Sequence, residues 1–121
     1  MWVCRAVLLF TGCLSLFLPL TTSVQALERP LSYQIHCEGC HKADGSGLEG
    51  FVPNFVGQLS SFLHVPEGRD FIIQVPGVAQ SSLSDGEVAE LMNWMVVAYD
   101  PSGVPDSFSP YTAQEAVSYT H

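Results

Sequence analysis

Apolar residues recur at helical spacing in one stretch of the chain, between residues 84 and 99. An α-helix brings residues three and four positions apart onto one face, so this spacing predicts a helix with one buried side. Ser84 and Glu87 have the spacing of a capping box that begins such a helix. Pro101 and Gly103 follow the stretch and end it. The apolar stripe consists of Val88, Leu91, Met92, Met95 and Tyr99.

Shorter elements are expected before this helix. Pro30 suits the first turn of a short helix that ends near Cys37. Residues 42–50 contain three glycines and predict an irregular loop. A second short helix is expected over residues 57–65 and ends at the following proline, whereas the apolar run 71–75 suits a helix or a strand equally well.

The sequence predicts one main domain, residues 27–100, with the C-terminal residues 101–121 as an extension of it. A proline-containing connection leads to Thr112 and Glu115, which have the spacing of a second capping box and predict a terminal turn or helix. The extension is too short for a domain of its own, so we expect it to lie over the main domain.

The N-terminus has the pattern of a secretory signal peptide. Arg5 is followed by an apolar stretch over residues 6–20, and Val24-Gln25-Ala26 ends in small residues like a cleavage site. We therefore expect residues 1–26 to be removed and the protein to be exported, most simply to the periplasm. The alternatives are a retained membrane anchor, although the apolar run is short and interrupted by Pro19, and a lipoprotein modified at Cys13.

The charge is strongly acidic. Twelve Asp and Glu residues stand against four Lys and Arg, one of which is Arg5 in the leader, and the formal net charge is −8. Nucleic acid and anionic membrane surfaces are disfavoured partners, because binding them requires basic side chains. The charge either keeps an exported protein soluble or steers it towards a basic docking surface on a redox partner.

The most specific motif is Cys37-Glu38-Gly39-Cys40-His41. C-x-x-C-H is the pattern by which haem is attached to protein, through two thioethers and with the histidine as an axial iron ligand. Half of a zinc site and a redox-active dithiol are the alternatives for two cysteines at this spacing. Export favours haem, because c-type haem is attached outside the cytoplasm.

With this motif in place, the chain resembles the class I monohaem cytochromes c over about residues 30–99. The resemblance implies an all-α fold, three to five short helices and loops wrapped around one covalently bound haem, in which Tyr33 and Trp94 meet where the first and last helices cross. It rests on Tyr33, the C-x-x-C-H motif, the loop Asp44-Gly45-Ser46-Gly47, the segment Pro53-Asn54-Phe55-Val56-Gly57 and the helix opening Leu83-Ser84-Asp85-Gly86-Glu87.

The resemblance also implies roles for individual residues. Cys37 and Cys40 would hold the haem, and His41 would be the proximal ligand through Nε2. The Pro53 carbonyl would accept a hydrogen bond from His41 Nδ1, which fixes the tautomer of the ring. Phe55 and Trp94 would pack against the haem or in the core.

The chain departs from this family at the distal position. Residues 76–83, where family members usually carry a methionine ligand, contain none. His64 is the first alternative as distal ligand, Met92 or Met95 the second, and an open or water-bound iron the third. Arg69 is expected to pair with a haem propionate or with neighbouring acidic residues.

Two filled axial positions would favour an electron carrier over an enzyme with a substrate-converting site of its own. The competing functions are a five-coordinate haem enzyme or gas sensor, and a haem subunit of a larger oxidoreductase. A tail that binds a partner protein is a third. Oligomeric state, reduction potential and redox partners do not follow from the sequence.

Overall fold

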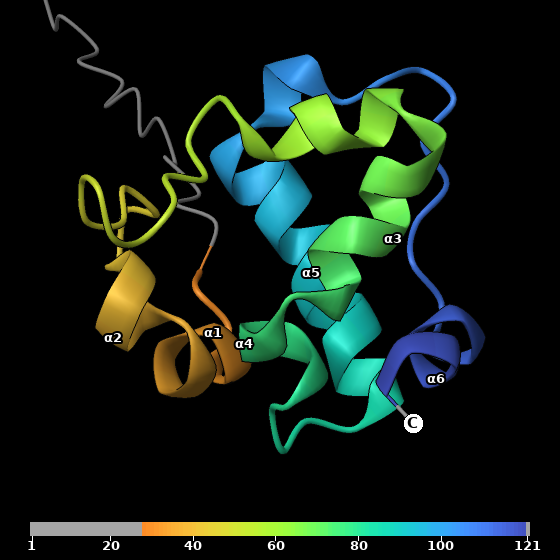
Figure 1. Cartoon of the computed structure of the whole chain (residues 1–121), viewed down its shortest axis with the longest axis horizontal. Coiled ribbons are helices and arrows are strands. Elements are labelled where there is room, and N and C mark those ends of the chain that lie inside the picture. Colours follow the sequence, from red (N-terminus) through yellow and green to blue (C-terminus); the bar gives the residue numbers. More distant parts are fainter. Residues whose placement is uncertain (1–27, 121) are drawn as a thin grey trace, which may run out of the picture.

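The structure, a computed structural model, describes residues 28–120. The leader 1–26 and its expected cleavage site therefore lie outside the described residues. Within residues 28–120 the chain forms six α-helices, two 3-10 helices and no strand, so the predicted all-α fold is confirmed (Figure 1). The elements are α1 (Leu31–His36), α2 (Glu38–His41), η1 (Leu59–His64), α3 (Pro66–Gln74), α4 (Pro76–Ala79), α5 (Asp85–Tyr99), η2 (Pro101–Gly103) and α6 (Ala113–Thr120).

The number of helices exceeds the expected three to five for a local reason. Pro66 and Pro76 each stand at the first position of a helix, α3 and α4. Proline is favourable there because its fixed φ suits the first turn and its missing N–H has no partner to lose. Pro66 therefore follows the end of η1 and also begins α3, and most of the ambiguous run 71–75 belongs to that helix.

Helix α5 forms as predicted. Ser84 Oγ accepts a hydrogen bond from the Glu87 N–H, and the Glu87 carboxylate accepts from the Ser84 N–H, which completes the capping box. The buried residues of α5 include four of the five in the predicted stripe, Val88, Leu91, Met92 and Met95. This helix is the centre of the core, and α1, η1 and α6 pack against it.

Helices α1 and α5 meet through aromatic side chains, as the resemblance implied. The ring centroids of Tyr33 and Trp94 lie 5.1 Å apart, and Tyr33 is fully buried. The Tyr33 hydroxyl donates to the carbonyl of Lys42 at 2.7 Å, which ties α1 to the loop after α2. This contact holds the cysteine-containing segment against the core.

We expect Tyr33→Ala to destabilise the protein by about 3–5 kcal/mol, because it removes a buried aromatic ring and leaves a cavity. Tyr33→Phe keeps the ring and loses one hydrogen bond, so its cost should be about 1 kcal/mol. Denaturant unfolding of the protein measures both values. Equal losses for the two variants would show that the hydroxyl, and not the ring, secures the crossing.

The C-terminal segment folds back along α3 and α5. Figure 1 shows the blue connection after η2 running beside α3 and the dark-blue α6 lying next to α5. Tyr111 is 4% exposed and Ala116 is fully buried. The Glu115 N–H donates to Thr112 Oγ1, as in the predicted capping box, but the Glu115 carboxylate bonds to Arg69 instead of closing the box. The side chain thus serves a contact between helices.

Among the residues that the structure describes, no helix is both long and apolar enough to cross a membrane.

Candidate functional site

The C-x-x-C-H motif occupies a single helical turn. Cys37 lies between α1 and α2, and its carbonyl accepts hydrogen bonds from the N–H groups of Cys40 and His41 at 3.2 and 2.9 Å. Residues one turn apart share a helix face, and Cys37 and His41 accordingly line the same cavity. The Cys37 thiol is half-buried and Cys40 is exposed, and neither forms a disulfide. Burial raises the pKa of the Cys37 thiol.

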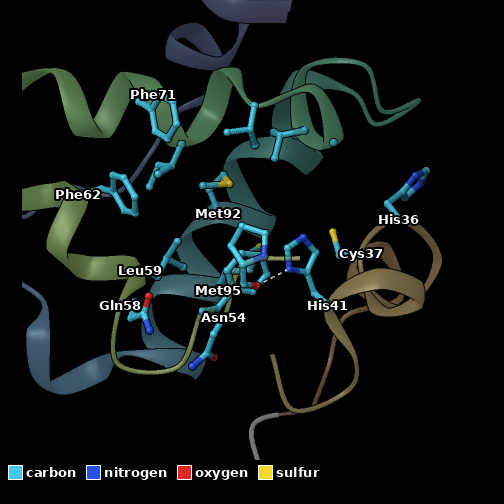
Figure 2. A pocket seen from close by; sticks show the side chains of 16 residues that line it. His36, Cys37, His41, Asn54, Gln58, Leu59, Phe62, Phe71, Met92 and Met95 are labelled. Atoms are coloured by element: carbon cyan, nitrogen blue, oxygen red, sulfur yellow. Dashed lines mark hydrogen bonds between the residues drawn. The ribbon is translucent and has the colours of Figure 1, made fainter. Parts of the chain in front are cut away.

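The His41 ring is held on two sides. Its Nδ1–H donates to the carbonyl of Pro53 at 3.1 Å, as the resemblance implied, and this bond is the dashed line at His41 in Figure 2. Its ring stacks on Phe55 with centroids 4.0 Å apart and planes 16° from parallel. Because a carbonyl only accepts, the proton resides on Nδ1 and Nε2 keeps its lone pair. Burial lowers the pKa of the imidazole, and the bond to Pro53 opposes this in part.

The glycine-rich loop brings the Pro53 carbonyl to the histidine. Gly47 has φ +66° and donates its N–H to the carbonyl of His41 at 3.1 Å. A Cβ atom at this position would lie 2.5 Å from the oxygen of Pro53. Only glycine tolerates both this backbone conformation and this close approach, which explains the loop sequence.

An apolar cavity of about 320 Å³ opens beside His41. Its volume is within the usual range for small-molecule and cofactor sites. α1, α2, η1, α3, α4, α5 and the loop before η1 all contribute to its walls. The principal lining side chains are Cys37, His41, Pro53, Phe55, Leu59, Phe62, Phe71, Ile72, Val75, Val78, Met92 and Met95. The cavity is therefore an apolar enclosure whose lining includes the imidazoles of His36 and His41 and the thioethers of Met92 and Met95.

Of the three candidates for the distal position, the structure brings Met92 and Met95 to the cavity. Both are buried, at 1% and 3% exposure, and both lie on α5. Figure 2 shows the sulfur of Met92 between Phe71 and His41. His64 does not line the cavity, and its Nε2 is hydrogen-bonded to the carbonyl of Gly103 at 2.9 Å. The histidine instead ties η1 to η2.

Two other expected cofactor contacts lie elsewhere. Trp94 packs against Tyr33 and Tyr99 in the core and does not line the cavity, and its buried Nε1 has no hydrogen-bond partner. The guanidinium of Arg69 bonds to Glu115 and to the carbonyl of Ser109, so its partner is neither a cavity group nor a neighbouring acid. Arg69 pairs with Glu115 and Ser109 because the C-terminal segment folds back over α3.

The aromatic wall formed by Phe62 and Phe71 was not foreseen. These rings stack with centroids 5.5 Å apart and line the cavity. Their signal was weak, because they lie on either side of Pro66, Phe62 in an expected short helix and Phe71 in a run that suited a helix or a strand. Recognising a helix start at Pro66 would have placed Phe71 on α3, with Val75 directly after the last residue of that helix.

Within residues 28–120, no group of three or more His, Cys, Asp or Glu side chains is placed to hold a metal ion by itself.

No family profile matches the chain. It is distantly similar to a cytochrome c. The relative is cytochrome c-552 of Thermus thermophilus, which is 29% identical over 97 residues, a region that covers 65% of this chain and 74% of the relative. A second cytochrome c-552 from the same species has the same identity, and the match covers 66% of its length. The similarity agrees with the arrangement of the motif and the helices.

Proposed function

We propose that the protein carries one haem c and works as an exported, periplasmic one-electron carrier. The observation that carries this proposal is His41, whose Nδ1 is bonded to the Pro53 carbonyl, in the wall of an apolar cavity that Cys37 also lines. The distant similarity to cytochrome c-552 supports it independently. The apolar N-terminal pattern supports export.

The residues present fit a c-type haem. Cys37 and Cys40 would form the two thioethers, and His41 would be the proximal ligand. The apolar lining suits a flat apolar ring system, and the exposed Cys40 leaves the attachment edge near solvent. When bound, haem supplies an iron centre that accepts and releases one electron.

The chain itself orients the ligand and excludes water. The Pro53 carbonyl fixes the tautomer of His41 and raises the basicity of Nε2. The stacked ring of Phe55 restricts rotation of the imidazole. Leu59, Ile72 and other apolar side chains form the remaining walls, which limits solvent rearrangement when charge changes. Trp94 and Arg69 are left out of the proposed haem contacts.

For the distal ligand, burial and position favour Met92 over His64. Met95 lies one helical turn away from Met92. The Met92 thioether lies in the cavity, whereas His64 has another partner outside it. Thioether ligation raises the reduction potential of a haem iron. A filled sixth position suits electron transfer, and a redox partner with a basic docking surface would complement the acidic charge of the chain.

Visible spectra and the intact mass of the purified protein test this function. We expect a Soret band, a mass that exceeds the mature polypeptide by one haem, and little binding of carbon monoxide by the reduced form. Rapid carbon monoxide binding would instead identify the five-coordinate enzyme or gas-binding alternative. Absence of both the Soret band and the added mass would reject haem altogether.

A further inference from the structure

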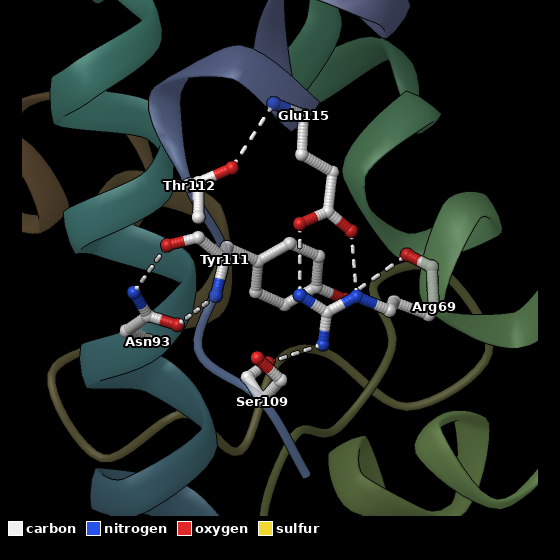
Figure 3. A network of polar contacts seen from close by, with 6 residues as sticks. All are labelled: Arg69, Asn93, Ser109, Tyr111, Thr112 and Glu115. Carbon is white, nitrogen blue, oxygen red and sulfur yellow. Dashed lines mark hydrogen bonds and ion pairs between the residues drawn. The ribbon is translucent and has the colours of Figure 1, made fainter.

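A group of polar contacts joins α3 to the segment that follows η2. The Arg69 guanidinium donates to both carboxylate oxygens of Glu115, at 2.6 and 2.9 Å, and to the carbonyl of Ser109 at 2.6 Å (Figure 3). The guanidinium carbon lies 4.0 Å from the centroid of the Tyr111 ring. Bidentate pairs of this kind are strong and fix geometry. Arg69 thus binds the C-terminal segment in two ways: the N–H groups of its guanidinium donate hydrogen bonds, and the face of the guanidinium packs on the Tyr111 ring.

The same segment is fixed to α5 through Asn93. The Asn93 side-chain amide donates to the carbonyl of Tyr111 at 3.0 Å, and the Tyr111 N–H donates to Asn93 Oδ1 at 2.7 Å. The Tyr111 hydroxyl reaches across to the carbonyl of Arg69 at 3.0 Å. One buried residue therefore connects α3 with α5.

Arg69 and Asn93, the two residues that hold this segment, are close in the sequence to residues that line the cavity. Arg69 precedes Phe71 and Ile72 on α3, and Asn93 follows Met92 on α5, and all three of these neighbours line the cavity. α6 packs against both helices. A segment that holds α3 and α5 together also sets the separation of the walls that they form.

We propose that residues 104–117, the C-terminal strap, act as a positioning element that keeps the methionine side of the cavity closed. Arg69 and Asn93 are its positioning residues. The inference rests on the proposed haem function, which gives the closed wall its purpose: to keep foreign ligands and water from the iron. Releasing the strap would let α3 move away from α5 without touching Cys37, Cys40 or His41.

The test uses Glu115→Ala in the full-length holoprotein. Removing the carboxylate leaves the half-buried guanidinium without its bidentate partner. We expect exogenous imidazole to bind the oxidised protein about tenfold faster, which corresponds to ~1.4 kcal/mol less cost of opening. Hydrogen exchange over residues 68–75 should quicken as well. Glu115→Gln, whose amide oxygen can still accept from Arg69, should be intermediate.

Glu90→Ala is the matched control, because it removes an exposed carboxylate from α5 that takes no part in the contacts of Arg69, Asn93 and Glu115. It should leave both readouts at the wild-type level. Faster exchange in the strap alone, with residues 68–75 and imidazole binding unchanged in Glu115→Ala and Glu115→Gln, would overturn the proposal. A wild-type protein without haem would overturn the proposed function, while the exchange over residues 68–75 would still decide whether the strap holds the wall.

Discussion

Replacing both Cys37 and Cys40 with alanine is expected to abolish covalent haem attachment. Each thiol would supply one thioether. The two cysteines lie on one helical turn, which would present both sulfurs to the same edge of a ring, and Cys37 lines the cavity. After denaturation and extraction, the double variant should have the mass of its polypeptide alone and no Soret absorbance. The wild type, treated in the same way, should keep both the extra mass and the band.

The single variants provide the control. Cys37→Ala and Cys40→Ala each keep one thiol, so each should retain haem through one thioether when enough protein matures. Cys37 lines the cavity while Cys40 is exposed, so losing Cys37 should also disturb packing, and the Cys37→Ala holoprotein should be the less stable of the two. Covalent haem in the double variant would contradict the proposed attachment.

Loss of covalent haem attachment should also lower the stability of the protein. The 320 Å³ apolar cavity lies among the packed helices, and an empty apolar cavity costs stability because its walls lose their contacts. The double variant should therefore unfold at a lower denaturant concentration than either single variant. Circular dichroism during denaturant titration provides that comparison.

The parts of the fold that follow from the sequence depend on local interactions. Helix α5 is encoded by a capping box and an apolar stripe that are complete within sixteen residues, and both formed as predicted. The bond between His41 and Pro53 also formed as the resemblance implied, because the glycine at position 47 brings the two residues together across a short loop. Spacing alone predicts the capping box and the stripe, whereas the His41–Pro53 bond was expected from the family resemblance.

The parts that were missed depend on contacts between distant segments. Arg69 and Glu115 are 46 residues apart, and nothing near either residue indicates that the chain folds back to join them. His64 is a good iron ligand by chemistry, yet its placement is decided by Gly103, 39 residues later. Such pairings depend on the tertiary structure of the whole chain. The sequence alone is therefore compatible with several partners for each side chain.

A pair of conservative substitutions on α5 tests which residue is the distal ligand. Met92→Leu keeps nearly the volume of the side chain, so the core should lose less than about 1.5 kcal/mol. It removes the thioether, however, and we expect the charge-transfer band between thioether sulfur and ferric iron to disappear. The reduction potential should fall, because thioether ligation is what raises it. Carbon monoxide should then bind the reduced variant readily.

Met95→Leu is the matched comparison, since it makes the same change one helical turn away in the same cavity. It should keep the band, as should His64→Ala, whose histidine bonds to Gly103 outside the cavity. Loss of the band in Met95→Leu and its retention in Met92→Leu would move the ligand one turn along α5. A wild-type spectrum without the band, together with a changed spectrum in His64→Ala, would mean that η1 rearranges to bring His64 to the iron, which would refute a methionine ligand.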